Sequence, residues 1–235
     1  MRLFESFLAD LGIDYIYSGP TTKETVDKGI GCSVSEACLP IQMIHGQVAS
    51  LVGKVDKILL PRLVNISGKT VFCPKFLGLP DMIRASLGCG KMLVSPRIDL
   101  RKGPLRTCLS FVRLARDLGA GGLRAAKLCA RDLFATLRDY PGPGVEIARQ
   151  ATVQPSGDVD VPVIGVLGYP YLLEDDYASM GLIRKLLSLN VKVLKADDVS
   201  EAQMKSVGET IPKQVFWYFT DRKVKSGYHW CRPGT

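Results

Sequence analysis

Two cysteines each stand just ahead of a proline at the predicted start of a helix. Cys38 lies two residues before Pro40, and Cys73 directly precedes Pro74. Proline fits the first turn of a helix, where its missing N–H costs nothing. A cysteine there faces unpaired backbone N–H groups and the positive end of the helix dipole, which favour the thiolate, the form that binds metals. The pair indicates iron–sulfur or zinc ligation, and the alternative is that each is a small buried hydrophobic side chain.

The spacing of the seven cysteines favours a cluster over zinc. Zinc ligands tend to come as close CxxC pairs, and the sequence contains none. Ligands on loops at the carboxyl ends of parallel strands suit a cluster in the crevice of an α/β sheet. Cys89, between two glycines, and Cys231, near the C-terminus, are candidates for an additional ligand. Cys108 and Cys129 fall within helical patterns and are expected in the core.

Four further residues are assigned supporting roles around these cysteines. Glu36 lies two residues before Cys38, and His45 follows it by seven residues, on roughly the same helical face. His45 is either a hydrogen-bond donor near the cysteine or a structural histidine. Arg62 and Lys75, next to predicted strand ends, would attract an anionic cluster or an anionic substrate. The chain has only two histidines, and nothing fixes either beside a nucleophile, so no catalytic residue is assigned.

The composition is that of a globular protein. The chain has 235 residues, of which 46% are hydrophobic and 23% charged, enough for one large or two small domains. Its apolar runs are far shorter than the roughly 20 residues that a membrane-spanning helix needs. The N-terminus lacks the features of a signal peptide. We therefore expect a cytoplasmic protein, with no membrane partner and with reduced cysteines.

Basic residues concentrate in the middle of the chain. The formal net charge is +8, and residues 97–138 hold ten Lys or Arg against three Asp. A basic face can bind nucleic acid or an anionic small molecule such as a nucleotide or CoA, and the alternative is a solvated helix surface. The stretch lacks the regular aromatic interleaving of a single-strand binder, so nucleic acid is not the expected partner.

Strands that alternate with helices predict an α/β fold with parallel sheets. Residues 154–160 form a polar linker, which separates a predicted N-terminal lobe (1–153) from a second lobe (161–235). Segment 215–219 is either strand or helix. The predicted helices cover residues 3–11, a segment from 21, about a dozen residues from 40, 79–87, 104–118, 121–139, 175–189 and a short segment from 198. The predicted strands cover 13–17, 55–60, 70–73, 92–95, 161–167 and 191–194.

Several short stretches together resemble the CoA protein activase family. This is the uncharacterised domain often found with the ATP-dependent activators of 2-hydroxyacyl-CoA dehydratases, and it is distantly related to the dehydratase subunits. The resemblance covers about residues 3–230. The stretches that carry it are Val34-Ser-Glu-Ala-Cys-Leu-Pro40, His45-Gly46, Leu59-Leu-Pro-Arg62, Cys73-Pro-Lys-Phe-Leu-Gly-Leu-Pro-Asp81, Ser95-Pro96 and Pro162-Val-Ile-Gly-Val-Leu-Gly-Tyr-Pro-Tyr171.

The resemblance implies two Rossmann-like lobes that hold an iron–sulfur cluster between them. It also implies low-potential electron transfer or reduction under anaerobic conditions. Cys38 and Cys73 then occupy the ligand positions, with a [4Fe–4S] centre as one expectation and the cluster type otherwise open. The expected partner is an activator ATPase or a companion subunit. The alternative is a cluster-free binding or regulatory module that docks on such an ATPase.

The chain departs from the family pattern in three places. It begins in the first helix, without the strand that usually precedes it, and it stops at Thr235, before a further Gly-Cys-Gly segment. Relative to the family it is thus expected to be truncated at both ends. The usual Gly-His-Pro-Tyr reads Gly168-Tyr169-Pro170-Tyr171 here. A third thiolate is missing, and we expect Cys231 or a partner chain to supply it.

Overall fold

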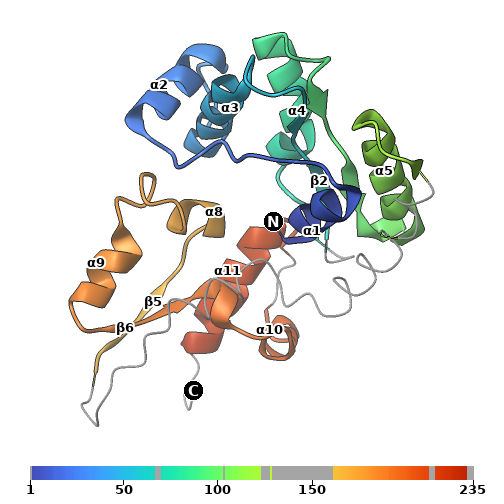
Figure 1. The fold of residues 1–235 in the computed structure, drawn as a ribbon. Coiled ribbons are helices and arrows are strands. Elements are labelled where there is room, and N and C mark those ends of the chain that lie inside the picture. Colours follow the sequence, from blue (N-terminus) through green and yellow to red (C-terminus); the bar gives the residue numbers. More distant parts are fainter. Residues whose placement is uncertain are drawn as a thin grey trace. The chain divides into compact units, whose positions relative to one another are not determined.

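The computed structural model describes residues 2–66, 70–102, 104–122, 128, 161–211 and 215–231. The chain divides into two compact units, Met1–Asp139 and Tyr140–Thr235 (Figure 1). Both contain helices and short parallel strands, which confirms the predicted α/β class. The predicted linker over 154–160 lies outside the described residues, as does most of the predicted helix over 121–139.

The first unit contains five described α-helices and four described strands. In chain order they are α1 (Arg2–Leu11), α2 (Lys23–Cys32), α3 (Leu39–Leu51), β1 (Ile58–Leu59), β2 (Arg62–Asn65), α4 (Pro74–Leu87), β3 (Leu93–Val94), β4 (Arg97–Asp99) and α5 (Pro104–Asp117). A short 3-10 helix, Leu100–Lys102, joins β4 to α5. The predicted helices over 3–11, from 40 and over 104–118 are confirmed.

Two strand predictions in this unit are wrong. Residues 13–17 form no strand, and Tyr15, Ile16 and Tyr17 are exposed. Their apolar character indicated a strand, but among the described residues no neighbouring strand pairs with them. Residues 70–73 contain only an isolated bridge at Val71, because α4 already begins at Pro74.

The four strands of this unit form two parallel pairs that share one register. Ile58 of β1 faces Leu93 of β3, and Arg62 of β2 faces Arg97 of β4. The offset of 35 residues is the same in both pairs as far as Leu63, so Pro61 stands opposite Pro96; the register then shifts by one, and Asn65 faces Asp99. Pro96 has no N–H to donate to the parallel ladder, although its carbonyl still accepts from the Arg62 N–H. The two pairs are therefore halves of one strand pair, interrupted where its prolines meet.

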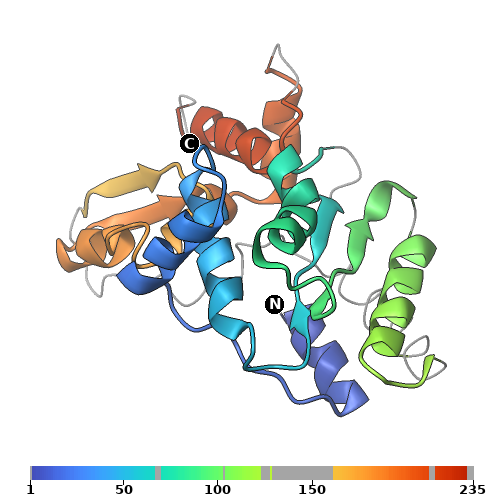
Figure 2. The same ribbon diagram turned by 90° about the horizontal axis from the view of Figure 1, so that it is seen from above.

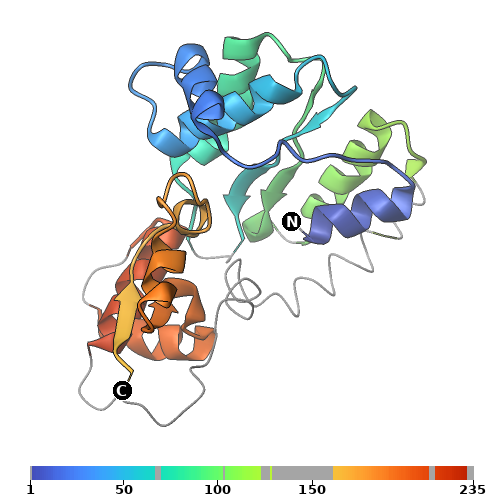
Figure 3. The ribbon, with the colours of Figure 1, turned by 60° about the vertical axis from the view of Figure 1, so that its left-hand side comes forward.

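Helices cover both faces of this strand pair (Figure 3). Successive side chains of a strand point to opposite faces, so neighbouring apolar residues need a packing partner on each side. Ile58 and Leu93 lie in a buried cluster with residues of α3 and α4, such as Ile41 and Ile83. The next residue of β3, Val94, lies in a second cluster with residues of α1 and α5. Those residues include Phe7 and Phe111, whose rings meet edge to face. The first unit is thus a layered helix–strand–helix arrangement.

The helices α2 and α3 cross with their backbones in direct contact. A Cβ atom on Gly29 would lie 1.8 Å from the carbonyl oxygen of Gln42, and one on Gly46 would lie 1.8 Å from that of Thr25. No side chain fits at either position. The contact fixes α3, the helix that begins beside Cys38, against its neighbour.

The second unit is built around one parallel strand pair. Its elements are β5 (Val163–Val166), α8 (Pro170–Leu173), α9 (Leu182–Ser188), β6 (Lys192–Lys195), a 3-10 helix (Ala196–Asp198), α10 (Glu201–Gly208) and α11 (Tyr218–Trp230). β5 and β6 lie side by side, with Val163 opposite Lys192 (Figure 2). The strands predicted over 161–167 and 191–194 are confirmed with shifted ends. Three pairs of two strands do not establish Rossmann-like lobes, which remain a prediction.

Two helix predictions in this unit change. The helix predicted over 175–189 is reduced to α9, which follows Gly181 in the left-handed conformation at φ +66°. The undecided segment 215–219 leads into α11 at Tyr218. The short helix predicted from 198 is α10, whose N-cap Ser200 exchanges hydrogen bonds with Gln203.

Charged groups are buried inside the second unit. Arg222 of α11 donates from Nε to Asp197 Oδ1 at 3.1 Å, and both side chains are buried. Lys195 of β6 pairs with Glu174 at 2.8 Å. Burial raises the pKa of Asp197, although the Arg222 guanidinium opposes that shift. These pairs connect the end of β6 to α11 and to the turn after α8.

Candidate functional site

Cys38 and Cys73 occupy equivalent positions at the starts of two helices. Each is the N-cap residue of its helix, α3 or α4, with a proline in the first turn and no hydrogen bond from its own side chain to the cap. The Cys38 carbonyl accepts from the Ile41 N–H at 2.9 Å, and the Cys73 carbonyl accepts from the Phe76 N–H at 2.9 Å. The backbone thus starts the helix while both thiols stay exposed. The predicted placement at helix starts is confirmed, and burial as small apolar side chains is not what the structure shows.

A contact between the two helix starts joins the two cysteine loops. Lys75 Nζ, two residues after Cys73, donates to the carbonyl oxygen of Glu36 at 3.4 Å. Glu36 in turn lies two residues before Cys38. Ala37 and Leu79 belong to the same buried cluster, so both loops rest on one part of the core. Two helix N-termini and an ammonium group make this a favourable place for an anionic group.

The exposed thiols of Cys38 and Cys73 number half of what a cysteine-ligated cluster needs. A cluster held by cysteines takes four of them, and the exposed pair provides two. Cys89 is buried among core side chains such as Ile83 and Leu93, and Cys231 is exposed at the C-terminal end of α11 in the second unit. Within the described ranges, no three His, Cys, Asp or Glu side chains gather where they could hold a metal ion. Cys38 and Cys73 thus fit two of the four positions in a set of four thiolate ligands.

The side chain of His45 is buried against its own helix, α3. It is 1% exposed, and its Nδ1 lies 2.7 Å from the carbonyl oxygen of Ile41, one helical turn earlier. Its imidazole is thus held by its own helix. This geometry agrees with a structural role for His45 rather than with a hydrogen bond near Cys38.

Arg62 connects β2 to α4. Its guanidinium donates to the Leu77 carbonyl at 2.6 Å and pairs with Asp81 Oδ2 at 2.6 Å. Arg84 binds the same carboxylate at 2.9 Å and reaches Ser95 Oγ at 3.3 Å. The hydrogen bond from Arg62 lowers the pKa of Asp81 below its ordinary value. Arg62 therefore has internal partners, and the geometry gives no support to its predicted attraction for an external anion.

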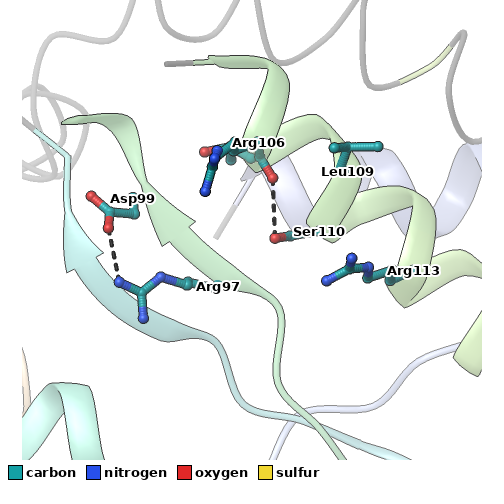
Figure 4. A pocket seen from close by; sticks show the side chains of 7 residues that line it. Arg97, Asp99, Arg106, Leu109, Ser110 and Arg113 are labelled. Atoms are coloured by element: carbon teal, nitrogen blue, oxygen red, sulfur yellow. Dashed lines mark hydrogen bonds and ion pairs between the residues drawn. The ribbon is translucent and has the colours of Figure 1, made fainter. Parts of the chain in front are cut away.

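A pocket between β4 and α5 was not predicted. It encloses about 360 Å³ and is lined by Arg97, Arg106, Arg113 and four neighbouring residues (Figure 4). The sequence showed these arginines only as part of a basic stretch. The spacing of seven between Arg106 and Arg113 placed them on one helical face. It could not show that Arg97 comes from the adjoining strand.

Asp99 lies at the strand side of this pocket. It is almost fully buried, and it accepts from Arg97 at 2.9 Å and from Arg101 at 3.3 Å. Burial by itself raises the pKa of Asp99, but the hydrogen bonds and charges of these two arginines outweigh it and lower the pKa. Asp99 is thus a neutralised, structural carboxylate.

Among the helices of the described residues, none is both long and apolar enough to cross a bilayer.

Comparison with known proteins gave one family. The sequence model of the CoA enzyme activase uncharacterised domain matches residues 1–199. No curated protein and no solved structure matches the chain. The matched residues include both helix-start cysteines, the Arg62–Asp81 pair and the basic pocket.

Proposed function

Because the chain belongs to the CoA enzyme activase uncharacterised-domain family, we propose that it is an iron–sulfur protein of CoA-enzyme activation. In this proposal it takes part in low-potential electron transfer, with Cys38 and Cys73 as cluster ligands. The observation that supports it is the matched geometry of the two exposed thiols, each at a helix N-cap with a proline after it. Structural cysteines are more often buried.

The chain's own residues would bind and stabilise the charged group. The N-termini of α3 and α4 would offset thiolate charge, and the Lys75 ammonium lies beside the Glu36 carbonyl in the same loop pair. A bound cluster supplies one-electron redox chemistry. Of the two remaining ligands, Cys231 would supply at most one, so a partner chain would supply at least one.

The test is iron and acid-labile sulfide per chain, measured on protein purified without oxygen, together with a visible absorption spectrum. Wild type is expected to carry iron and sulfide in near-stoichiometric amounts, and Cys38→Ser or Cys73→Ser should lose most of both. Cys32→Ser is the matched control, because Cys32 lies at the end of α2 rather than at a helix start. Iron content that is unchanged in Cys38→Ser would overturn the assignment.

A second candidate is a cluster-free module that docks on an activator ATPase. The observation that favours it is the segment between α1 and α2, where Tyr15, Ile16 and Tyr17 are 44%, 63% and 53% exposed. Adjacent exposed aromatic and apolar side chains are typical of a protein interaction surface. In this case an activator ATPase should bind the iron-free chain in a calorimetric titration. Ile16→Asp should abolish that binding, whereas Cys38→Ser should leave it intact.

A further inference from the structure

We propose that the pocket between β4 and α5 binds a phosphate group carried by a small molecule. The lining of the pocket includes neither of the two cysteines and no residue of the exposed segment 15–17, so the inference does not depend on the proposed function. It rests on three observations: two arginines without an ion-pair partner and a buried hydroxyl without a hydrogen-bond partner, both among the described residues, and a small pocket volume.

The arginines of the pocket come from two adjoining elements. Arg106 and Arg113 extend from one face of α5, and Arg97 extends from β4 (Figure 4). Among the lining residues, three arginines stand against the single carboxylate of Asp99, which leaves a net charge of +2. Both Asp99 oxygens are bound by arginines, Oδ2 by Arg97 and Oδ1 by Arg101. The carboxylate is therefore already neutralised.

Arg106 and Arg113 have no ion-pair partner within the described part of the chain. Their guanidinium groups remain available to a ligand. Arginine presents a planar fork of N–H donors that matches two oxygens of one phosphate. Two such groups on one side of a pocket are an arrangement suited to a doubly charged anion.

Thr107 provides an observation that points to a ligand independently of the arginines. It lines the pocket and is 1% exposed, and among the described residues its hydroxyl has no hydrogen-bond partner. Buried hydroxyl groups are nearly always paired, because an unpaired one loses its hydrogen bonds to water. The Thr107 oxygen is itself inaccessible to solvent, so a rotation about χ1 would be needed before it could donate to a phosphate oxygen in the pocket. Ser110, on the next turn of α5, adds a second hydroxyl to the lining.

The size and lining of the pocket favour a small ligand over nucleic acid. A volume of about 360 Å³ is near the lower end for small-molecule sites. None of the seven lining residues is aromatic, so the pocket offers no platform for stacked bases. The shared chemistry of the ligand is thus a phosphate group, free or attached to a nucleotide or to CoA.

The test is calorimetric titration of the full chain with inorganic phosphate, ATP, CoA and dephospho-CoA. At least one of these should bind. Arg106→Gln and Arg113→Gln should each weaken that binding tenfold or more. Arg116→Gln is the matched control, since it removes the same charge from the same helix outside the pocket lining. Binding of CoA but not of dephospho-CoA would assign the site to the 3′-phosphate, whereas binding of phosphate or ATP would assign it to those sources.

Two further variants separate a built site from general charge. Thr107→Val keeps the shape of the side chain and removes the hydroxyl, so it should weaken binding several-fold without lowering the melting temperature. Arg106→Lys keeps the charge and loses the fork, so it should bind less tightly than wild type. The proposal is overturned if no probe binds, if Arg116→Gln weakens binding as much as Arg106→Gln, or if Thr107→Val binds like wild type. It is also overturned if only a single-stranded oligonucleotide binds, with a steep dependence on salt.

Discussion

Gly29 of α2 and Gly46 of α3 meet at the point where the two helices cross. The position of a Cβ on Gly29 lies 3.0 Å from the backbone nitrogen of Gly46, and the position of a Cβ on Gly46 lies 3.0 Å from that of Gly29. The crossing gives a physical reason for glycine in the His45-Gly46 stretch that carries the family resemblance. It also makes α2 a support for the helix that begins at Cys38.

We expect Gly46→Ala to destabilise the first unit by about 3 kcal/mol or more, because backbone atoms rather than a flexible side chain oppose the new methyl group. The measurement is urea denaturation followed by circular dichroism. Gly31→Ala in α2 is the control, since a Cβ there meets nothing within 4 Å, and it should be neutral or stabilising. Equal midpoints for the two variants would contradict the close crossing.

Arg222→Met should destabilise the second unit by about 3–5 kcal/mol, because it leaves the Asp197 carboxylate buried without its cation. The pKa of Asp197 is already raised by burial. Loss of Arg222 raises it further, so part of the lost stability should return as the pH falls and the carboxyl takes up a proton. Melting temperatures at pH 7 and pH 5 measure both effects. The double variant Arg222→Met with Asp197→Leu should recover most of the loss, and a failure to do so would argue against the pair as the cause.

Asp99→Asn should cost about 2 kcal/mol at neutral pH, through weaker hydrogen bonds to Arg97 and Arg101. The folded-state pKa of Asp99 lies below its ordinary value of 3.8. The stabilisation from its charge is therefore complete above that value and is lost as the pH falls through the folded-state pKa. Urea midpoints measured between pH 7 and pH 3 should show wild type and variant converging below about pH 4. A constant gap between wild type and Asp99→Asn over this range would refute the pairing.

The Arg62–Asp81 pair should show a coupling energy of about 1 kcal/mol in a double-mutant cycle of Arg62→Gln and Asp81→Asn. The value is modest because the Asp81 side chain is 60% exposed. Arg62→Gln alone should cost more than Asp81→Asn alone, since it also removes the hydrogen bond to the Leu77 carbonyl. Strictly additive effects would show that the pair is not formed in solution.

The helices were easier to predict than the strands, for a physical reason. The helical spacing of Phe4, Phe7 and Leu11 is a pattern that only a packed helix face explains, and α1 lies where it was expected. A short apolar run such as 13–17 carries no information about whether another strand is near it. The helix predicted over 79–87 begins earlier, at Pro74, which is the start that the Cys73-Pro74 pattern itself indicates, and it continues through Pro80.

The candidate site was predictable to the extent that it is local in sequence. The N-cap positions of Cys38 and Cys73 depend on the residues next to them, and the structure shows both. The pocket between β4 and α5 depends on the packing of these two elements and on the burial of Thr107. Neither can be seen in the spacing of residues along the chain. The contact of Lys75 with Glu36 is likewise a product of how α3 and α4 pack.

The facing prolines of the interrupted strand pair also affect the outer edge of the sheet. The Leu60 N–H donates to Val94 and the Arg62 N–H to Pro96, so residue 61 is the one whose nitrogen faces away from this neighbour. No strand pairs with that edge among the described residues, and Pro61 offers no donor there. A strand from another molecule would therefore lose a hydrogen bond at the middle of that edge. Pro61 thus disfavours edge-to-edge growth of the sheet on that side.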